Sequence, residues 1–145
     1  MARTSTYLNF MGRTEEAFTF YSKVFQAEIA SPVHRMRDAP PAPGMPALSE
    51  AEKDLVMHIE LPITGGHVLM GTDALESMGH SVTFGNNVSL NLEPDTRAEA
   101  ERLFHALSEG GRVTMPLADM FWGSLFGALT DRFGVQWMVN CAAKA

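Results

Sequence analysis

The sequence predicts an α+β fold made of two βαβββ modules, with the helices on the outer face of a mixed sheet. Two observations favour it: segment 6–25 aligns without a gap to segment 88–107, and each segment changes from alternating to helical periodicity. A period of two is typical of a strand with one buried face, whereas spacings of three and four indicate a helix. At 145 residues we expect a single domain spanning 1–145, with modules at about 5–75 and 86–141.

The repeat consists of matched residue classes more than of identities. In the first copy Leu8 alternates with Tyr7 and Asn9, so the polar side chains share one face of the expected strand. The second copy alternates in the same way. The matched positions are Leu8 and Leu90, Asn9 and Asn91, Phe10 and Leu92, Thr14 and Thr96, Tyr21 and Leu103, and Phe25 and Leu107.

A helix is expected after each first strand. Thr14 is the predicted N-cap of the first helix, and the acidic Glu15 and Glu16 favour its positive end. The second helix is expected to begin near Asp95 or Thr96 and to end at Gly110–Gly111. The apolar faces at helical spacing are Ala17, Phe18, Tyr21, Val24 and Phe25, and then Ala100, Leu103, Phe104 and Leu107.

Three strands are expected after each helix. In the second half the last two form a hairpin whose turn, Asp131 to Gly134, has residues suited to a type I turn. Helices then cover one face of each sheet and leave the other free. The expected strands are 28–37, 54–63 and 67–73 in the first half, and 112–116, 123–130 and 135–140 in the second.

Segment 38–54 stands outside the repeat and is rich in proline and alanine. Proline cannot donate to a sheet ladder, so this segment is not a central strand, although a helical turn is expected at 49–53. Loops of this length are usually lids or disordered connectors, and both interpretations stay open. Segment 74–87 links the two halves.

The composition excludes some classes of partner. The net charge is −6, and without a basic stripe we expect no nucleic-acid partner. No apolar run is long enough to cross a bilayer, so no membrane association is expected. The N-terminus has no apolar core typical of a signal peptide, and a lone cysteine, Cys141, cannot form a disulfide within the chain. We therefore expect a cytoplasmic protein with a buried, inert thiol.

Several stretches together resemble a known family. They are YLNFMGRTEEAFTFYSKVF, VMHIEL, VLMGTDA, VSLNLEP and GGRVTMPLADMFWGSLFGALTDRFGVQW, and they cover nearly the whole chain. The chain resembles the PhnB-like branch of the vicinal oxygen chelate superfamily, which includes glyoxalase I and extradiol dioxygenases. Proteins of this branch have often carried the name 3-demethylubiquinone 3-methyltransferase, but the sequence shows no methyl-donor motif.

The resemblance implies a cup formed by the free sheet faces, a small-molecule ligand, a homodimer and, in many members, a divalent metal. Such members take metal ligands from the first and last strand of each module. The corresponding positions here are Ser5, Tyr7, Asn9, Met70, Asn87, Ser89, Asn91 and Met138. Because none is His, Asp or Glu, we expect that the four-ligand site is lost and that no residue binds metal there. A divalent metal is not favoured, and the cofactor stays unknown.

His58 and Glu60 are the candidate catalytic pair. Residues two apart on a strand share a face, so both side chains reach one substrate or ion. His58 is the candidate for acid–base chemistry because histidine is the residue type that ordinarily titrates near neutral pH. The alternative is a hydrogen-bonded strand histidine beside a solvated glutamate.

The remaining candidates bind a ligand through apolar and neutral polar groups. Methionine adapts to irregular ligands, and Trp122 beside Gly123 is a pocket or interface candidate, whereas Trp137 has the parity of a core residue. Two functions stay open: a non-catalytic binding protein, or a metal-dependent or acid–base enzyme of lyase, isomerase or dioxygenase type with a remade site around His58 and Glu60. The ligand-binding candidates are Tyr7, Asn9, Met70, Ser89, Asn91, Trp122, Phe126 and Met138.

Overall fold

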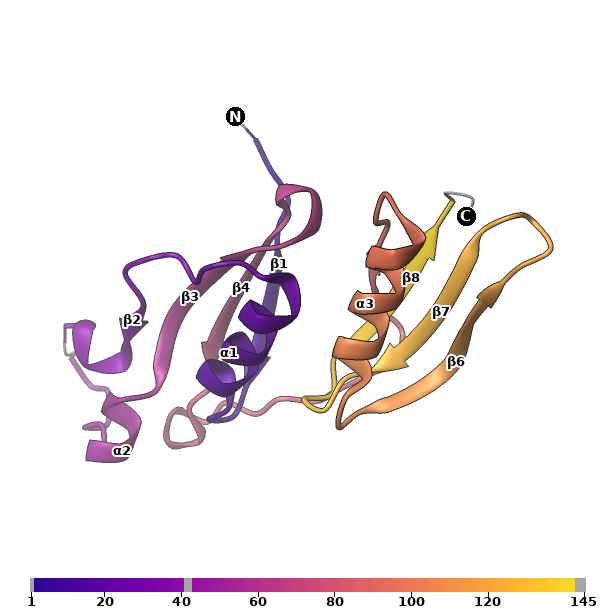
Figure 1. Ribbon diagram of the computed structural model, residues 1–145. Coiled ribbons are helices and arrows are strands. Elements are labelled where there is room, and N and C mark those ends of the chain that lie inside the picture. The colour runs from indigo at the N-terminus through magenta and orange to yellow at the C-terminus, as the bar shows by residue number, and fades with distance from the viewer. Residues whose placement is uncertain (1, 41–42, 143–145) are drawn as a thin grey trace. The chain divides into compact units, whose positions relative to one another are not determined.

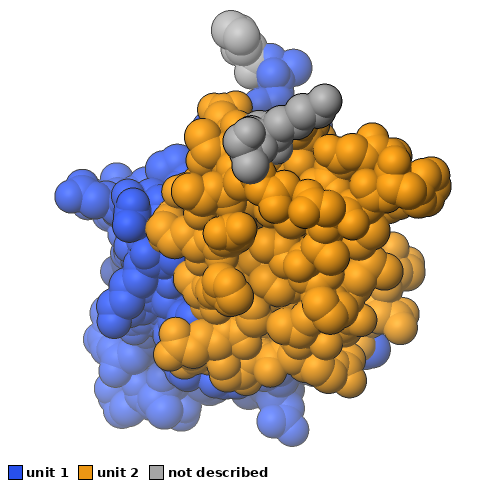
Figure 2. Space-filling view, turned by 45° about the vertical axis from the view of Figure 1, so that its right-hand side comes forward, with its two compact units in different colours: residues 1–83 blue, residues 84–145 orange. Residues whose placement is uncertain are grey.

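The computed structural model of the protein describes residues 2–40 and 43–142. The chain forms two compact units, residues 1–83 and residues 84–145, which are coloured separately in Figure 2. Each unit holds a four-stranded mixed sheet with one long helix packed on it. This arrangement confirms the predicted α+β fold of two βαβββ modules.

Unit 1 carries its sheet in the order β1-β4-β3-β2. Strand β1 runs parallel to β4, and the other neighbours are antiparallel. Helix α1 packs against β3 and β4, as Figure 1 shows in indigo and magenta. The elements are β1 Thr6–Phe10, α1 Thr14–Phe25, β2 His34–Arg35, α2 Glu50–Lys53, β3 Val56–Pro62 and β4 Val68–Asp73, with short 3-10 helices η1 Met36–Asp38, η2 Thr64–Gly66 and η3 Glu76–Met78.

Unit 2 repeats this topology with the order β5-β8-β7-β6. Strand β5 runs parallel to β8, and the two remaining pairs are antiparallel. Helix α3 packs on β7 and β8. The elements are β5 Leu90–Leu92, α3 Arg97–Ser108, β6 Arg112–Asp119, β7 Leu125–Thr130 and β8 Gln136–Cys141.

The core of each unit lies between the helix and the sheet. The predicted helix faces are buried, except that Phe25 is only half-buried. Trp137 is 0% exposed, which confirms its predicted place in the core. Cys141 is buried as a free thiol at the end of β8, also as predicted. Residues of opposite parity on the same strands are exposed or half-buried, so each sheet has a free face within its own unit.

The predicted N-cap of the first helix is wrong. Helix α1 has Arg13 as its N-cap, without a side-chain hydrogen bond, and Thr14 is the first helical residue. The Thr14 hydroxyl instead donates to Asp73 Oδ1 at 2.7 Å, and the same oxygen accepts the Thr14 backbone N–H. The carboxylate at the end of strand β4 therefore takes the place of a local N-cap. In the second helix Thr96 is the N-cap, which agrees with the predicted start near Asp95 or Thr96.

The predicted strand at 28–37 is also wrong, since only His34–Arg35 forms a strand. Pro32 has no N–H to give to a ladder, which interrupts the expected pairing. The helical turn predicted at 49–53 is confirmed as α2, with Ser49 as N-cap. The interpretation of the whole loop 38–54 as a lid or a connector stays a prediction, and residues 41–42 lie outside the described part of the chain.

Strand ends in the second unit differ from the prediction. Strand β6 continues to Asp119, and β7 begins at Leu125 instead of Gly123. Trp122 therefore lies in the turn between these strands, where Gly123 N–H donates to the Met120 carbonyl at 3.0 Å. Gly123 has a φ of +96°, a conformation that glycine adopts at little cost.

Two buried carboxylates, which the sequence analysis missed, organise the units. Asp73 at the end of β4 accepts hydrogen bonds from the backbone N–H groups of Gly12, Thr14 and Val56. It thereby joins the end of β4 to the start of α1 and the start of β3. Asp131 has a local role, since it accepts bonds from two backbone N–H groups of its own turn and from the Trp137 indole at 2.8 Å.

Candidate functional sites on the free sheet faces

The free face of unit 1 carries a chain of polar contacts. The Tyr7 hydroxyl lies 2.9 Å from His58 Nδ1, and His58 Nε2 lies 2.8 Å from Glu60 Oε2. The Tyr7 and His58 rings are 5.6 Å apart between centroids. Arg3 extends the chain with a guanidinium nitrogen 3.7 Å from the other Glu60 oxygen. The structure thus brings the two predicted catalytic residues together and adds Tyr7, which we predicted as a ligand-binding residue.

The groups in this series of polar contacts shift the pKa values of Glu60 and Tyr7. The hydrogen bond from His58 is the main reason that the pKa of Glu60 lies below its ordinary value, and Arg3 adds to the effect. Burial raises the pKa of the Tyr7 phenol, and the Glu60 carboxylate raises it further. Glu60 is therefore ionised and Tyr7 is neutral near pH 7.

The hydrogen-bond geometry defines two proton arrangements. Ionised Glu60 only accepts, so His58 Nε2 carries the hydrogen of their shared bond. When His58 is neutral, its Nδ1 accepts the Tyr7 hydroxyl proton. When His58 is protonated, Nδ1 donates to Tyr7, and the Tyr7 hydroxyl is then able to donate outward. A proton can therefore move along the chain in either direction.

Other predicted ligand-binding residues share this face. Tyr7 lies opposite Met70 across β1 and β4, and Asn9 lies opposite Thr72. Met70 is half-buried, and its sulfur lies 3.7 Å from the Ser5 hydroxyl. Asn9 is exposed. The predicted positions Tyr7, Asn9 and Met70 therefore lie on adjacent strands of one surface.

The free face of unit 2 is less polar. Asn91 lies opposite Met138, and Phe126 lies opposite Asn140. Ser89 is exposed and directly precedes β5. The Asn140 side-chain oxygen is buried without a hydrogen-bond partner among the described residues. All four predicted ligand-binding residues on or next to β5, β7 and β8 thus share a face.

Trp122 extends this face from the turn between β6 and β7. Its ring packs edge-on to Phe126 with centroids 6.3 Å apart, and Phe121 packs on it at 5.0 Å. The Trp122 side chain is 55% exposed. An exposed aromatic group that contacts the free face fits the predicted pocket or interface role.

The strand registers show which positions correspond in the two units. Met70 lies opposite Tyr7, and the residue in the same place in unit 2 is Gln136, not Met138. Met138 instead corresponds to Thr72. We placed the two methionines at matching positions, and this is wrong by two residues along the strand. The parallel register, which long-range pairing fixes, decides which positions match.

The side chains at the family's metal positions do not fit a hard divalent ion. The donors there are hydroxyls, amides and thioethers, with Gln136 added by the register. Such ions prefer carboxylates and imidazole. In residues 2–40 and 43–142, no group of three or more His, Cys, Asp and Glu side chains is placed to hold a metal ion.

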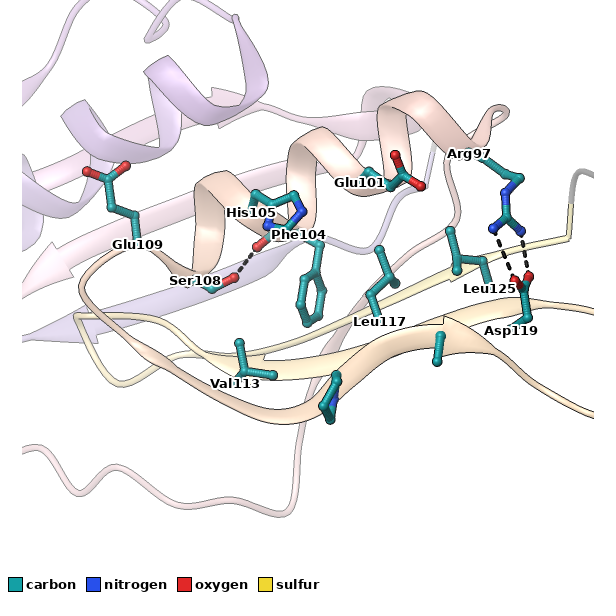
Figure 3. Close-up of a pocket in the computed structure, with 12 residues that line it drawn as sticks. Arg97, Glu101, Phe104, His105, Ser108, Glu109, Val113, Leu117, Asp119 and Leu125 are labelled. Atoms are coloured by element: carbon teal, nitrogen blue, oxygen red, sulfur yellow. Dashed lines mark hydrogen bonds and ion pairs between the residues drawn. The ribbon is translucent and has the colours of Figure 1, made fainter. Parts of the chain in front are cut away.

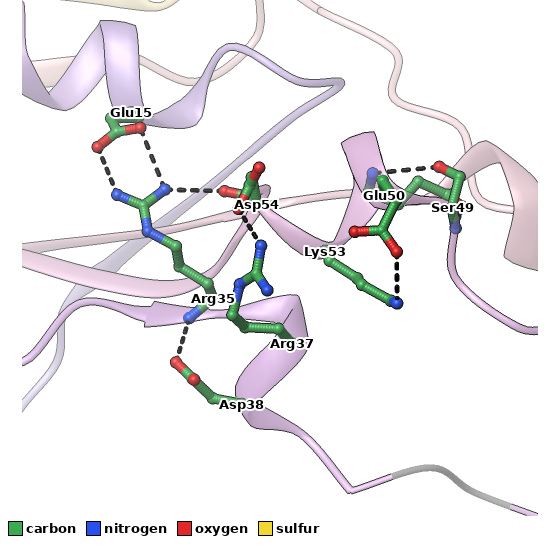
Figure 4. A network of polar contacts seen from close by, with 9 residues as sticks. Glu15, Arg35, Arg37, Asp38, Ser49, Glu50, Lys53 and Asp54 are labelled. Carbon is green, nitrogen blue, oxygen red and sulfur yellow. Dashed lines mark hydrogen bonds and ion pairs between the residues drawn. The ribbon is translucent and has the colours of Figure 1, made fainter.

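A network of ion pairs holds the ends of loop 38–54 (Figure 4). Arg35 pairs with Glu15 on α1 at 2.7 Å and donates to the Asp54 carbonyl at 2.8 Å. Arg37 pairs with the Asp54 carboxylate. Helix α2, in the last part of the loop, has a capped N-terminus, since the Ser49 hydroxyl accepts from the Glu52 N–H at 3.2 Å. The contacts of Arg35 and Arg37 join the segment before the loop to helix α1 and to Asp54 at the end of the loop.

A groove that the sequence analysis missed lies in unit 2 between α3 and β6 (Figure 3). Its volume is about 690 Å³, with Phe104, Val113 and Leu117 among its apolar lining. Arg97 and Asp119 form an ion pair at 2.6 Å at one end. The sequence gives no local signal of this groove, because the groove lies on the helix-facing side of an edge strand. None of the predicted site residues lines it.

No helix in the described part of the chain is long and apolar enough to span a membrane.

Comparison with known proteins places the chain in a family. The family model described as 3-demethylubiquinone-9 3-methyltransferase matches residues 2–140. Protein PA1353 from Pseudomonas aeruginosa is 39% identical over 97% of this chain and 98% of its own, with a TM-score of 0.80. A Bacillus cereus protein titled a putative 3-demethylubiquinone-9 3-methyltransferase, PhnB protein, is 30% identical over 97% and 100%, with a TM-score of 0.75.

A more distant structure shares the fold alone. It is a glyoxylase/bleomycin resistance protein/dioxygenase domain from Frankia, 9% identical over 100% of this chain and 95% of its own, with a TM-score of 0.65. The family model and the two closer structures agree with the paired βαβββ topology. The chain therefore belongs to the PhnB-like family described as 3-demethylubiquinone-9 3-methyltransferase.

Proposed function

We propose that the protein binds a small molecule on its free sheet faces. One observation carries this proposal: on each sheet the face opposite the helix bears exposed or half-buried aromatic, methionine and amide side chains. Within the described residues of each unit no helix packs on this face. Family membership supports the same function without naming a ligand, because a fold alone does not define a reaction.

The exposed aromatic residues supply the main binding surface. Tyr7 is 47% exposed and Trp122 is 55% exposed. Aromatic rings contribute large apolar area with few rotatable bonds, which favours flat ligands. Each face also carries a half-buried methionine, Met70 in unit 1 and Met138 in unit 2, which can adapt to the outline of a ligand on its own face.

Tryptophan fluorescence tests this proposal. Trp122 is exposed, whereas Trp137 is fully buried and bonded to Asp131. A panel of flat apolar ligands should change the emission of the wild-type protein, and Trp122→Phe should remove the response while the Trp137 signal persists. A panel without any effect on the wild-type protein would contradict the proposal.

Acid–base catalysis is a second candidate, and the contacts of 2.9 Å and 2.8 Å along Tyr7, His58 and Glu60 favour it. A neutral Tyr7 hydroxyl gives its proton to a ligand oxygen and takes one from protonated His58 Nδ1. Neutral His58 remains bonded to Glu60. General acid groups act over such hydrogen-bond distances.

Deuterium exchange separates the two candidates. An enzyme should exchange the α-protons of a small carbonyl compound, such as dihydroxyacetone, with solvent deuterium. His58→Ala and Tyr7→Phe should abolish that exchange, while Trp122→Ala should leave it nearly unchanged. Failure to exceed the rate of His58→Ala with a panel of small carbonyl compounds would count against catalysis.

Three finer features belong to this proposal. We infer that no divalent metal serves as cofactor, and calorimetric titration with Mn²⁺, Ni²⁺ and Zn²⁺ should then show no tight binding.

We infer a homodimer, as the resemblance implies, which light scattering should show as twice the chain mass of 15.9 kDa. We also infer a cytoplasmic setting, since the free Cys141 is suited to a reducing compartment.

A further inference from the structure

We propose that unit 1 holds a second recognition element, a methionine-lined pocket formed in part by residues 36–40 and 45–48, that takes the apolar part of a neutral ligand. It rests on the proposed binding function and names the class of ligand and its place. Asn9 and Thr72, which lie on the free face, are part of its lining. No residue of this lining except Asn9 was among the predicted ligand-binding residues.

Two adjoining hollows form the pocket. Their volumes are about 650 Å³ and about 640 Å³, within the range of small-molecule sites. They share the side chains of Met36, Met45, Leu75 and Met78. These shared residues come from η1, the loop, and the segment around η3, so side chains distant in sequence line both hollows.

The lining of the first hollow is mainly apolar. It consists of methionine, leucine, alanine and proline side chains, with two cationic residues, Arg37 and Lys53. Thioethers are flexible and polarizable, so three methionines in one wall suit an apolar ligand of irregular outline. This composition gives the pocket its preference for an apolar group.

The arginine, lysine and aspartate that line the pocket already have partners within the protein. Arg37 pairs with Asp54, and Lys53 pairs with Glu50 at 2.9 Å. Asp73, which lines the second hollow, accepts three backbone N–H groups. A charged ligand would need an unmatched counter-charge to offset its loss of hydration. The pocket therefore suits a neutral ligand.

A single hydrogen-bonding group on the ligand has partners in the lining. Asn9 is exposed and lies opposite Thr72. Asn9 also lies two residues from Tyr7 on the same face of β1, so a ligand that fills the pocket presents its polar end toward Tyr7. This connection places the apolar pocket beside the proton chain of Tyr7, His58 and Glu60.

The walls are held before any ligand binds. Figure 4 shows that ion pairs of Arg35 and Arg37 fix one end of the loop to Glu15 and Asp54. Ser77 in η3 donates to the Glu52 carboxylate in α2, which ties the two sides together. A preformed pocket lowers the ordering cost of binding.

Methionine methyl NMR tests the proposal with 1-naphthol, a neutral flat probe with one hydroxyl. Carbon-13 methyl signals of Met36, Met45 and Met78 should shift on titration, whereas Met115 on β6 should not. Met45→Glu should weaken binding by roughly tenfold or more, because it places an unmatched carboxylate in the apolar wall.

The matched control is Met11→Glu. Met11 is 41% exposed and Met45 is 52% exposed, both in unit 1, but Met11 lines neither hollow. Met11→Glu should bind 1-naphthol like the wild type. Equal affinities of Met45→Glu and Met11→Glu, or no shift at the three pocket methyls, would overturn the proposal.

Two further outcomes separate this inference from the proposed function. A ligand response at Trp122 without shifts at the pocket methyls rejects the pocket and leaves the binding function in place. Absence of both responses rejects both. Tighter binding of the anionic 1-naphthoate than of 1-naphthol would overturn the assignment of a neutral ligand.

Discussion

The two units share a topology and differ in the chemistry of their free faces. The strand registers place Glu60 and Thr130 at corresponding positions, and His58 and Ala128 two residues earlier on the same strands. Unit 1 thus carries an ionisable pair where unit 2 carries a methyl group and a hydroxyl. The helix-facing pattern defines the fold in both units, whereas the free faces are available to diverge.

The units also differ in how a buried carboxylate is used. Asp73 joins segments that are 17 to 61 residues away in sequence, whereas Asp131 contacts residues two to six positions away. Unit 1 therefore depends on one long-range polar junction, and unit 2 on a locally stabilised hairpin turn that also orients Trp137.

The largest expected effect comes from removing these carboxylates. Asp73→Ala leaves three N–H groups without their acceptor and should destabilise the protein by about 3–5 kcal/mol. Asp131→Ala should cost about 2–3 kcal/mol, since all of its donors belong to one hairpin. Urea unfolding followed by circular dichroism measures both, with exposed Asp95→Ala as the control within about 0.5 kcal/mol. A larger loss for Asp131→Ala would reverse the comparison.

A smaller effect is expected where each helix packs on a glycine. A Cβ at Gly71 would lie 2.6 Å from the ring of Phe18, whereas a Cβ at Gly127 would lie 2.7 Å from Phe104 and 2.9 Å from the Leu117 backbone. Side chains shift more easily than backbone. Gly127→Ala should therefore cost about 2–3 kcal/mol and Gly71→Ala about 1–2 kcal/mol.

Thermal unfolding of both glycine variants checks this order. Gly85→Ala is the matched control, since its nearest neighbour would lie at an ordinary 3.5 Å. Equal losses at Gly71 and Gly127 would show that the backbone of β6 moves as readily as a side chain.

The titration of Glu60 provides a third prediction. Its pKa is lowered from 4.5 mainly by His58, so its stabilising contact is present above pH 4.5 and is lost as the pH falls through the lower folded value. His58→Ala should raise the pKa of Glu60 toward 4.5 in a carboxyl NMR titration. Tyr7→Phe retains the His58 contact and should leave the pKa low. An unchanged Glu60 pKa in His58→Ala would assign the shift to Arg3.

The smallest effect on stability is expected from moving the pair to unit 2. Ala128→His with Thr130→Glu changes half-buried positions on the free face, and should alter stability by less than about 1 kcal/mol. The carboxylate at position 130 should have a lower pKa in the double variant than in Thr130→Glu alone. Identical values would mean that the geometry of β3 cannot be reproduced on β7.

Much of the fold was predictable, because alternation and helical spacing report directly which side chains are buried. The pattern placed Trp137 in the core, and it placed Tyr7 and Met138 on exposed or half-buried strand faces. It could not reveal the Asp73 junction, because residues 12, 56 and 73 meet only in the folded unit. The missing strand before His34 followed from a proline whose effect depends on its partner strand.

The candidate site was predictable only in part. His58 and Glu60 share a face by their spacing, but the contact of Tyr7 with His58 depends on how β1 and β3 lie across β4. The match of Met70 with Gln136 depends on the parallel register. The pocket formed in part by residues 36–40 and 45–48 combines loop side chains, whose positions no periodic pattern defines.

The bond from the Val56 N–H to Asp73 has a consequence for how this protein can vary. This bond defines where β3 begins, independently of the segment before it. The ion pair of Arg35 with Glu15 holds the other end of that segment, which contains loop 38–54. Loop-closure entropy rises slowly with length. The segment between these two anchors can therefore gain or lose residues with little disturbance of the sheet.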